Sequence, residues 1–391
     1  MTTTPAPARL RAITREIERG RDALVSFDPS DFAWLHHETR LVATGVAVRV
    51  APDDVDSLLS TIDVDDSLGI PGTGAVAVGA LPFEPAAPAD LVVPARVFGE
   101  VDGRAWVTEI GPAAVDAHHA GRAPSRFSVV ASRSREQWDE AVRAALDAIA
   151  RGDLEKVVLA REVLIEADAP FDLVDVLRRL CAQQLGCFVY ASDGLVGASP
   201  ELLVRRTGTT VESRPVAGTT VADSEEALRA LARSAKDNRE HGFVVDAIAD
   251  ALGAVCTSLE VGMVPEVAVF GPVAHLATPI RGRLSQPAPS ALELARVLHP
   301  TPAVGGTPRA AALAAIPELE GFDRGRYAGP VGWVDADGNG EWAIALRCAE
   351  LDEARARLVA GAGIVEGSDP ADEWAETQVK LEPMLRALVR P

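Results

Sequence analysis

The residues most suggestive of chemistry lie near the C-terminus, where positions 361–380 read GAGIVEGSDPADEWAETQVK. The Ser-Asp-Pro sequence at 368–370 is typical of a helix start, so Glu373, Glu376 and Lys380 should follow on one helix. Spacings of three and four residues place these side chains along one line. Two carboxylates and an ammonium group could hold a divalent metal ion and an anionic ligand together. The alternative is an exposed Glu–Lys ion pair of little energetic value.

Glycine and arginine positions nearby strengthen the case for a site. Gly361 and Gly363 precede the helix, and two glycines let the backbone come close to another group. Arg347 lies in an apolar strand, where a guanidinium could grip a carboxylate through a forked pair of hydrogen bonds. Gly218 and Thr219 close a turn and offer backbone amides and a hydroxyl to an anion.

Lysine is rare in this chain, because only three of the 38 basic residues are lysine: Lys156, Lys236 and Lys380. Lys156 interrupts a Val/Leu run, and a lysine in apolar surroundings can lose its proton and act as a base. Glu201 follows a Ser-Pro pair and opens a strand, so it should lie at a sheet end, a common place for a catalytic acid. For both residues the alternative is a side chain that reaches solvent.

Glu240 extends the apolar stripe of a helix that begins KDNREHGFVVDAIADAL. A carboxylate on a buried face needs a partner, because an isolated buried charge is far too costly. The simplest alternative is a cap or a contact with Lys236, four residues earlier.

Composition narrows the function class. The net charge of −19 and the pI of about 4.8 argue against nucleic-acid binding, and an anionic substrate would need compensation from a metal or placed cations. The four cysteines show no metal-binding spacing, and we expect them to be reduced in a cytoplasmic protein. No signal peptide or membrane-length apolar run is evident. The histidine pairs 36–37 and 118–119 are not expected to bind metal, because adjacent side chains in a strand or loop are expected to point apart.

The expected strands occur mostly as consecutive hairpins, with helices between them. This order predicts an α+β domain with antiparallel sheets. The turn at 337–340 reads Asp-Gly-Asn-Gly and favours a hairpin. Residues 1–125 are expected to be the N-terminal part of the same domain, and 126–391 the catalytic region. The predicted helices are Ala12–Leu24, Ser134–Arg151, Leu173–Gln184, Ser224–Leu259 in one or two pieces, Ala291–Leu298 and Pro308–Leu319.

Several motifs in one order resemble a known family. KVVLAR, GASPELLVRR, SRPVAGT, KDNREH, HLATPIRG, LHPTPAVGGTP, GWVDADGNGEW and the C-terminal segment are together similar to the chorismate-utilising enzymes related to anthranilate synthase component I, and most of all to isochorismate synthases. The resemblance is strong from about position 151 onward. It implies a single α+β domain in which two antiparallel sheets pack as a sandwich with helices outside, and it favours a monomer.

The resemblance also implies roles for individual residues. Mg²⁺ would be bound by Glu240 and Glu376, with Glu373 nearby, and would hold the ring carboxylate of chorismate. The remaining contacts implied are Lys380, Gly218 and Thr219 to the ring carboxylate, Arg347 and Gly361 to the enolpyruvyl carboxylate, Lys156 as the base for water attacking C2, and Glu201 as the acid for the hydroxyl leaving C4. His275 is either a substrate contact or a core histidine.

Three positions separate the relatives. Enzymes that use ammonia lack the lysine at position 156, and Ala217 excludes the lysine nucleophile of aminodeoxychorismate synthases. Salicylate synthases tend to carry a hydroxyl residue near Ala303, so alanine there favours stopping at isochorismate. The alternatives are a salicylate synthase and, from another class, a non-catalytic ligand- or metal-binding protein. Isochorismate serves siderophore or menaquinone synthesis, and the sequence favours neither.

Overall fold

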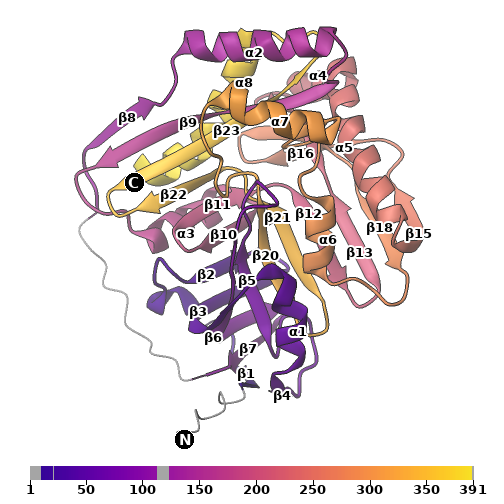
Figure 1. The fold of residues 1–391 in the computed structure, drawn as a ribbon. Helices are drawn as coiled ribbons and strands as arrows, with labels where there is room; N and C mark the ends of the chain where they lie inside the picture. Colours follow the sequence, from indigo (N-terminus) through magenta and orange to yellow (C-terminus); the bar gives the residue numbers. More distant parts are fainter. Residues whose placement is uncertain (1–9, 21, 112–122, 390–391) are drawn as a thin grey trace, which may run out of the picture.

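An antiparallel framework of strands runs through the chain, with helices packed against it (Figure 1). The computed structural model describes residues 10–20, 22–111 and 123–389. Hydrogen bonds join the described strands into a 20-stranded network and a separate three-stranded sheet. The predicted α+β class with antiparallel sheets is confirmed, although the two sheets differ greatly in size.

The N-terminal strands form one end of this framework, drawn in indigo and purple in Figure 1. The predicted helix over Ala12–Leu24 is wrong, because residues 11–17 form a strand that pairs antiparallel with residues 105–109. Ala12 and Thr14 face the buried side, and the strand partner supplies burial that local helix propensity does not anticipate. The strands here are β1 Arg11–Ile17, β2 Phe32–Leu35, β3 Thr39–Val50, β4 Asp63–Asp65, β5 Val76–Ala80, β6 Leu91–Val101 and β7 Arg104–Glu109.

The remaining strands of the large network carry most of the predicted chemistry. They are β8 Phe127–Ala131, β9 Lys156–Ala167, β10 Phe188–Ser192, β11 Leu195–Ser199, β12 Leu202–Thr207, β13 Thr210–Arg214, β15 Cys256–Val261, β18 Ile280–Leu284, β19 Gly306–Thr307, β20 Pro330–Asp335, β21 Gly340–Ile344, β22 Cys348–Asp352 and β23 Arg355–Val365. The three-stranded sheet contains β14 Val216–Val221, β16 Glu266–Phe270 and β17 Val273–Ala277. The predicted turn at 337–340 does connect β20 to β21.

The helices largely follow the sequence pattern. Those described are α1 Val55–Ser60, α2 Arg135–Ala150, α3 Leu173–Gln183, α4 Glu225–Arg233, α5 Ala235–Gly253, α6 Ala291–Leu298, α7 Arg309–Glu320 and α8 Pro370–Val389, with 3-10 turns at Ala23–Ser26 and Pro52–Asp54. The long helix predicted over 224–259 breaks at Ser234, which caps α5 by accepting the N–H of Asp237. Its last residues form β15 instead, because they pair with β18.

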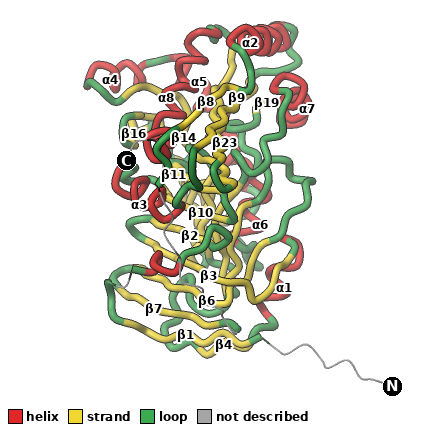
Figure 2. Tube along the Cα trace, turned by 90° about the vertical axis from the view of Figure 1, so that its left-hand side faces the viewer, coloured by secondary structure: helices red, strands yellow, loops and turns green. Residues whose placement is uncertain are grey.

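Two contacts organise the region of interest. β9 and β23 pair antiparallel along their length, with Lys156 opposite Val365 and Ala160 opposite Gly361. Helix α8 then packs on β23, and α5 packs on β14. Figure 2 shows β1, β4 and β7 at one end of the molecule and α2 at the other. No helix among the described residues is long and apolar enough to cross a lipid bilayer. All four cysteines are unpaired, as predicted.

Candidate functional site

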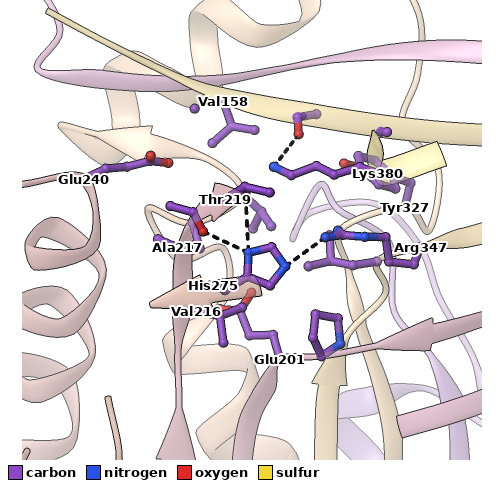
Figure 3. A pocket seen from close by; sticks show the side chains of 18 of the residues that line it. Val158, Glu201, Val216, Ala217, Thr219, Glu240, His275, Tyr327, Arg347 and Lys380 are labelled. Carbon is purple, nitrogen blue, oxygen red and sulfur yellow. Dashed lines mark hydrogen bonds between the residues drawn. The ribbon is translucent and has the colours of Figure 1, made fainter. Parts of the chain in front are cut away.

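A cavity of about 610 Å³, measured out to its open mouth, lies between β9, β23, β14 and β17. Figure 3 shows side chains from several elements around it. Nine of the predicted site residues line the cavity: Glu201, Gly218, Thr219, Glu240, His275, Ala303, Arg347, Gly361 and Lys380.

Three other predicted site residues are not in the cavity lining. Lys156 and Glu376 each contact a lining residue, Glu240 and Lys380 respectively. Glu373 lies further back on α8. The structure therefore gathers all the predicted residues in one region, although they were drawn from segments far apart in the sequence.

Glu201 follows Pro200 in the short link between β11 and β12, at the sheet end that the sequence predicts. The residue is 1% exposed, and its Oε1 has no hydrogen-bond partner among the described residues. Burial raises the pKa of Glu201 to about 8, even though positive charges nearby act in the opposite direction. A carboxyl group that keeps its proton near neutral pH can act as a general acid.

Arg347 is held at the cavity by a buried histidine. The predicted strand position is wrong, because Arg347 lies in the link between β21 and β22. Its φ of 49° is in the left-handed region, which is uncommon for a residue other than glycine. The Nη2 group donates to Nε2 of His275 at 3.0 Å, and Nδ1 of His275 donates to the carbonyl of Gly218 at 2.9 Å. Burial, then the charge of Arg347, lowers the pKa of His275 well below its usual range, so the neutral ring can accept this bond. His275 is therefore buried, and it also lines the cavity and orients the guanidinium of Arg347.

Lys156 is fully buried, and its Nζ lies 3.0 Å from Oε1 of Glu240. The partner of Glu240 is thus Lys156, and the local contact with Lys236 does not form. Burial opposes the ionisation of Glu240, but Lys156 and Lys380 outweigh it and hold the pKa below its usual value. Gly363 makes room for this pair, because a Cβ atom there would overlap Oε1 of Glu240 and lie 3.2 Å from Cε of Lys156.

Each of the three lysines pairs with a different glutamate of this region. The pairs are Lys156–Glu240 at 3.0 Å, Lys236–Glu373 at 2.6 Å and Lys380–Glu376 at 2.5 Å. Glu373 is 1% exposed, so the alternative of a solvent-exposed ion pair does not hold for it. Burial and then the negative charge of Glu376 raise the pKa of Glu373, so these two carboxylates interact electrostatically. A group of carboxylates is stabilised by positive charge nearby. Its oxygen atoms are the ligands that a hard divalent cation prefers.

The C-terminal helix also reaches the strand behind it. Lys380 donates from Nζ to the carbonyl of Gly361 at 2.9 Å. A Cβ at Gly361 would lie 3.2 Å from the hydroxyl of Tyr327 and 3.1 Å from a methyl group of Val158. The close approach predicted for the glycines at 361 and 363 is therefore present at both.

Sequence reasoning missed several participants. Tyr327 and Val158 line the cavity but are ordinary core residues by type. Gly363 and Lys236 each had a signal, the glycine run and the rarity of lysine, without an assigned role. No local pattern could identify their partners, because these lie more than 100 residues away in the chain.

A buried ion pair supports the cavity wall from α7. Arg324 donates to both carboxylate oxygens of Glu320 at 2.5 and 2.9 Å, to the carbonyl of Val304 at 2.7 Å and to that of Val158 at 2.9 Å. Glu320 accepts the N–H of Ala160 at 2.6 Å. β19 pairs with β9 only at residues 156 and 157. Beyond the end of β19, the side chains of Arg324 and Glu320 form the hydrogen bonds to backbone groups of β9 on that side.

One geometric expectation about histidines is wrong. His36 and His37 do not point apart, because they lie in the turn after β2, and their ring centroids are 4.0 Å apart. His118 and His119 lie outside the described residues.

Comparisons with known proteins identify the family. Residues 106–389 match the profile of a family described as chorismate binding enzyme. Isochorismate synthase DhbC of Bacillus subtilis is 41% identical over 329 residues, covering 80% of each chain. Isochorismate synthase EntC of Escherichia coli is 40% identical over 325 residues, covering 79% of this chain and 80% of EntC. The structure of MenF, the menaquinone-specific isochorismate synthase from Escherichia coli, superimposes with a TM-score of 0.83 at 25% identity, covering 97% of this chain and 95% of MenF. The chain therefore belongs to the chorismate binding enzyme family.

Proposed function

We propose that this protein is an isochorismate synthase, which converts chorismate to isochorismate by adding water at C2 and losing the hydroxyl at C4. The observation that carries the proposal is Glu201, a buried carboxyl group whose pKa is raised to about 8 by burial, on the wall of the cavity that also holds Arg347. The names of the relatives at about 40% identity support the same reaction.

Substrate binding follows from the cationic and backbone groups of the wall. Arg347, held by His275, and the backbone at Gly361 would bind the enolpyruvyl carboxylate. Lys380 and the segment Gly218–Thr219 would contact the ring carboxylate. The prediction that these two residues close a turn is wrong, because they lie within β14, at an irregularity in its pairing with β17. Two anionic groups at separate points would orient the ring between Lys156 and Glu201, a positioning effect that by itself lowers the barrier.

The two proton transfers require one residue that donates a proton and another that accepts one. Glu201 keeps its proton and donates it to the hydroxyl leaving C4, so the C–O bond breaks with loss of water. Lys156 accepts a proton from the water whose oxygen forms the new bond at C2. In the described structure Lys156 is paired with Glu240, so it must leave this carboxylate before it can act as a base.

The carboxylate oxygens of three glutamates in this region are ligands of the type that Mg²⁺ prefers. Glu240 and Glu376 would hold it, with Glu373 close by, and the bound ion would supply positive charge for the ring carboxylate. The same three glutamates each pair with a lysine, which is consistent with a cluster built to be neutralised by cations.

Residues 126–391 would form the catalytic region, and 1–125 would complete the sheet of the same domain. The protein would act in the cytoplasm as a monomer. The pairing of β2 with β10 and of β5 with β20 supports one domain, because N-terminal strands enter the network next to catalytic-region strands.

A salicylate synthase remains the second candidate, because it would use the same acid and base and then eliminate pyruvate. Ala303 at the cavity wall, where we expect a hydroxyl residue in salicylate synthases, favours the first reaction. A binding protein without activity is the third candidate.

One experiment separates these functions. Purified protein is incubated with chorismate and Mg²⁺, and the products are identified by chromatography. Isochorismate alone is expected. Salicylate with pyruvate would favour the second candidate, and no turnover would favour the third.

A further inference from the structure

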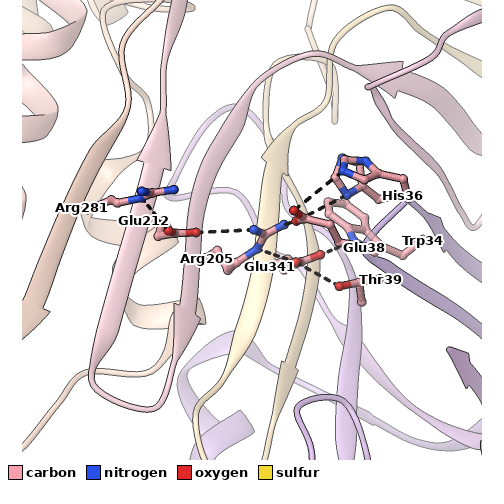
Figure 4. A network of polar contacts seen from close by, with 9 residues as sticks. Trp34, His36, Glu38, Thr39, Arg205, Glu212, Arg281 and Glu341 are labelled. Atoms are coloured by element: carbon pink, nitrogen blue, oxygen red, sulfur yellow. Dashed lines mark hydrogen bonds and ion pairs between the residues drawn. The ribbon is translucent and has the colours of Figure 1, made fainter. Parts of the chain in front are cut away.

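The turn between β2 and β3 carries three side chains of types that can bind metals, and Figure 4 shows two of them, His36 and Glu38, with their polar neighbours. His36, His37 and Glu38 follow one another in this turn, which is closed by a hydrogen bond from the N–H of His36 to the carbonyl of Thr39 at 3.0 Å. One nitrogen or oxygen atom from each of the three residues lies within 4.8 Å of the other two.

The shortest of these contacts is near the spacing of ligand atoms in a metal site. Nε2 of His37 lies 3.7 Å from Oε1 of Glu38, whereas Nδ1 of His36 lies 4.0 Å from the other carboxylate oxygen, Oε2. Metal–ligand bonds of about 2.0–2.2 Å in tetrahedral geometry put ligand atoms about 3.3–3.6 Å apart. The side chains of His37 and Glu38 are 69% and 49% exposed, so both can make this small adjustment and leave a position open for water.

His36 supplies a buried nitrogen without a partner. Its side chain is only 6% exposed, and Nδ1 has no hydrogen-bond partner among the described residues. The ring stacks on Phe188 with centroids 4.3 Å apart, which fixes its plane. Buried polar atoms normally have partners, and a metal ion would be one here.

A second layer of contacts orients the carboxylate. Arg205 Nη2 lies 2.6 Å from Oε2 of Glu38, which leaves Oε1 directed at His37. Arg205 is itself fixed by Glu341 at 2.6 Å, and Glu341 accepts the indole N–H of Trp34 at 2.7 Å. Ligating carboxylates are usually held by hydrogen bonds of this kind.

The charge balance of this network permits a cation despite the arginine. Three carboxylates, Glu38, Glu212 and Glu341, contact Arg205, and one more arginine, Arg281, contacts Glu212. Three acids against two arginines leave a net negative charge within the network.

We propose that His36, His37 and Glu38 form a binding site for a divalent transition metal ion such as Zn²⁺. None of the three residues lines the cavity, so the site is distinct from the one assigned to Mg²⁺. Two imidazoles and a carboxylate suit Zn²⁺, Ni²⁺ or Cu²⁺, whereas Mg²⁺ prefers oxygen ligands. The bound ion would tie the turn, through Glu38 and Arg205, to the strands β12 and β21.

Calorimetric titration of the full chain with Zn²⁺, in buffer with saturating Mg²⁺, tests the site. We expect a Zn²⁺ site in the wild type that His37→Ala and Glu38→Gln each weaken at least about tenfold. Both side chains are exposed, so both variants should fold. The controls are the double variant His118→Ala/His119→Ala, which removes the other adjacent histidine pair, and Glu225→Gln, which removes another exposed carboxylate paired with arginine. Both controls should keep the site.

An isotherm of His37→Ala that superimposes on that of the wild type would overturn the proposal. Loss of the site in the 118/119 double variant with retention in His37→Ala would also overturn it. As a second measurement, Zn²⁺ should raise the Tm of the wild type more than that of His37→Ala. Equal shifts in the two proteins would contradict the assignment. Because the readout is binding, the result does not depend on whether the protein converts chorismate.

Discussion

Two groups of buried opposite charges flank the cavity, and they are bonded in different ways. Arg324 has four hydrogen bonds, two of them to Glu320 and two to backbone carbonyls of the cavity wall. Lys156 has a single ion pair, with Glu240 at 3.0 Å. A guanidinium is a rigid planar fork, whereas an ammonium is a point charge on a flexible chain that can change partners and lose its proton.

The two kinds of bonding indicate two roles: the arginine pair stabilises the fold, and the lysine–glutamate group serves catalysis. The arginine pair satisfies backbone groups of β9 on the side where β19 has ended, so replacing it would leave hydrogen-bonding groups of the cavity wall without partners. The three lysine–glutamate pairs involve side chains alone apart from the bond of Lys380 to Gly361. We therefore expect substitutions in the arginine pair to change stability, and substitutions in the lysine–glutamate group to change catalysis and metal dependence.

The largest effect should come from Lys156→Ala. Loss of the proposed base should lower kcat by about 10²- to 10⁴-fold, while calorimetry should still detect chorismate binding in the presence of Mg²⁺. Lys236→Ala is the matched control, since Lys236 belongs to the same group without contacting a cavity residue, and it should lose much less. Full activity of Lys156→Ala would show that Lys156 is not the base.

Arg324→Ala should instead lower the free energy of unfolding by about 3–5 kcal/mol, because Glu320 would remain buried without its partner. Urea denaturation measures this loss, and added Mg²⁺ should not reverse it. Arg229→Ala, which removes an exposed arginine paired with Glu225, should cost about 0.5 kcal/mol or less. Equal losses in the two variants would contradict the structural role given to Arg324.

The pH dependence should identify the acid. Glu201 must be protonated to donate, so kcat/KM should fall as pH rises through about 8. The raised pKa also means that the folded protein loses stability between the usual carboxyl pKa and about 8, because the unfolded chain ionises first. Glu201→Gln cannot donate this proton and should lower kcat, and its Tm relative to the wild type should increase from pH 5 to pH 9. A Tm difference independent of pH would argue against a raised pKa.

The smallest effect concerns the metal. Glu376→Gln should raise the Mg²⁺ concentration needed for half-maximal activity by about tenfold, because one proposed ligand loses its charge. Glu382→Gln, on the same helix and paired with Arg386, should leave the Mg²⁺ titration unchanged. An identical titration for Glu376→Gln and the wild type would remove Glu376 from the ligand set.

Local signals predicted the elements that begin and end within one segment. Helix α6 spans Ala291–Leu298 as predicted, and a capping box between Ser290 and Glu293 explains its start. The segment 11–17 was assigned wrongly because its conformation depends on pairing with β7, which lies about 90 residues away. The strand β15 was merged into a helix for the same reason, since β18 decides its conformation.

The sequence alone indicated which side chains to expect in the site, because rare lysines, a carboxylate on an apolar helix face and closely spaced glycines are unusual wherever the chain folds them. It also carried the resemblance to the family. Only the tertiary structure decided the pairing. Glu240 meets Lys156 and not its neighbour Lys236, and His36 and His37 converge in a turn and do not diverge along a strand. The physical reason is that residue type and local spacing are properties of one segment, whereas burial, charge partners and the pKa of a group such as Glu201 depend on which other segments pack around it.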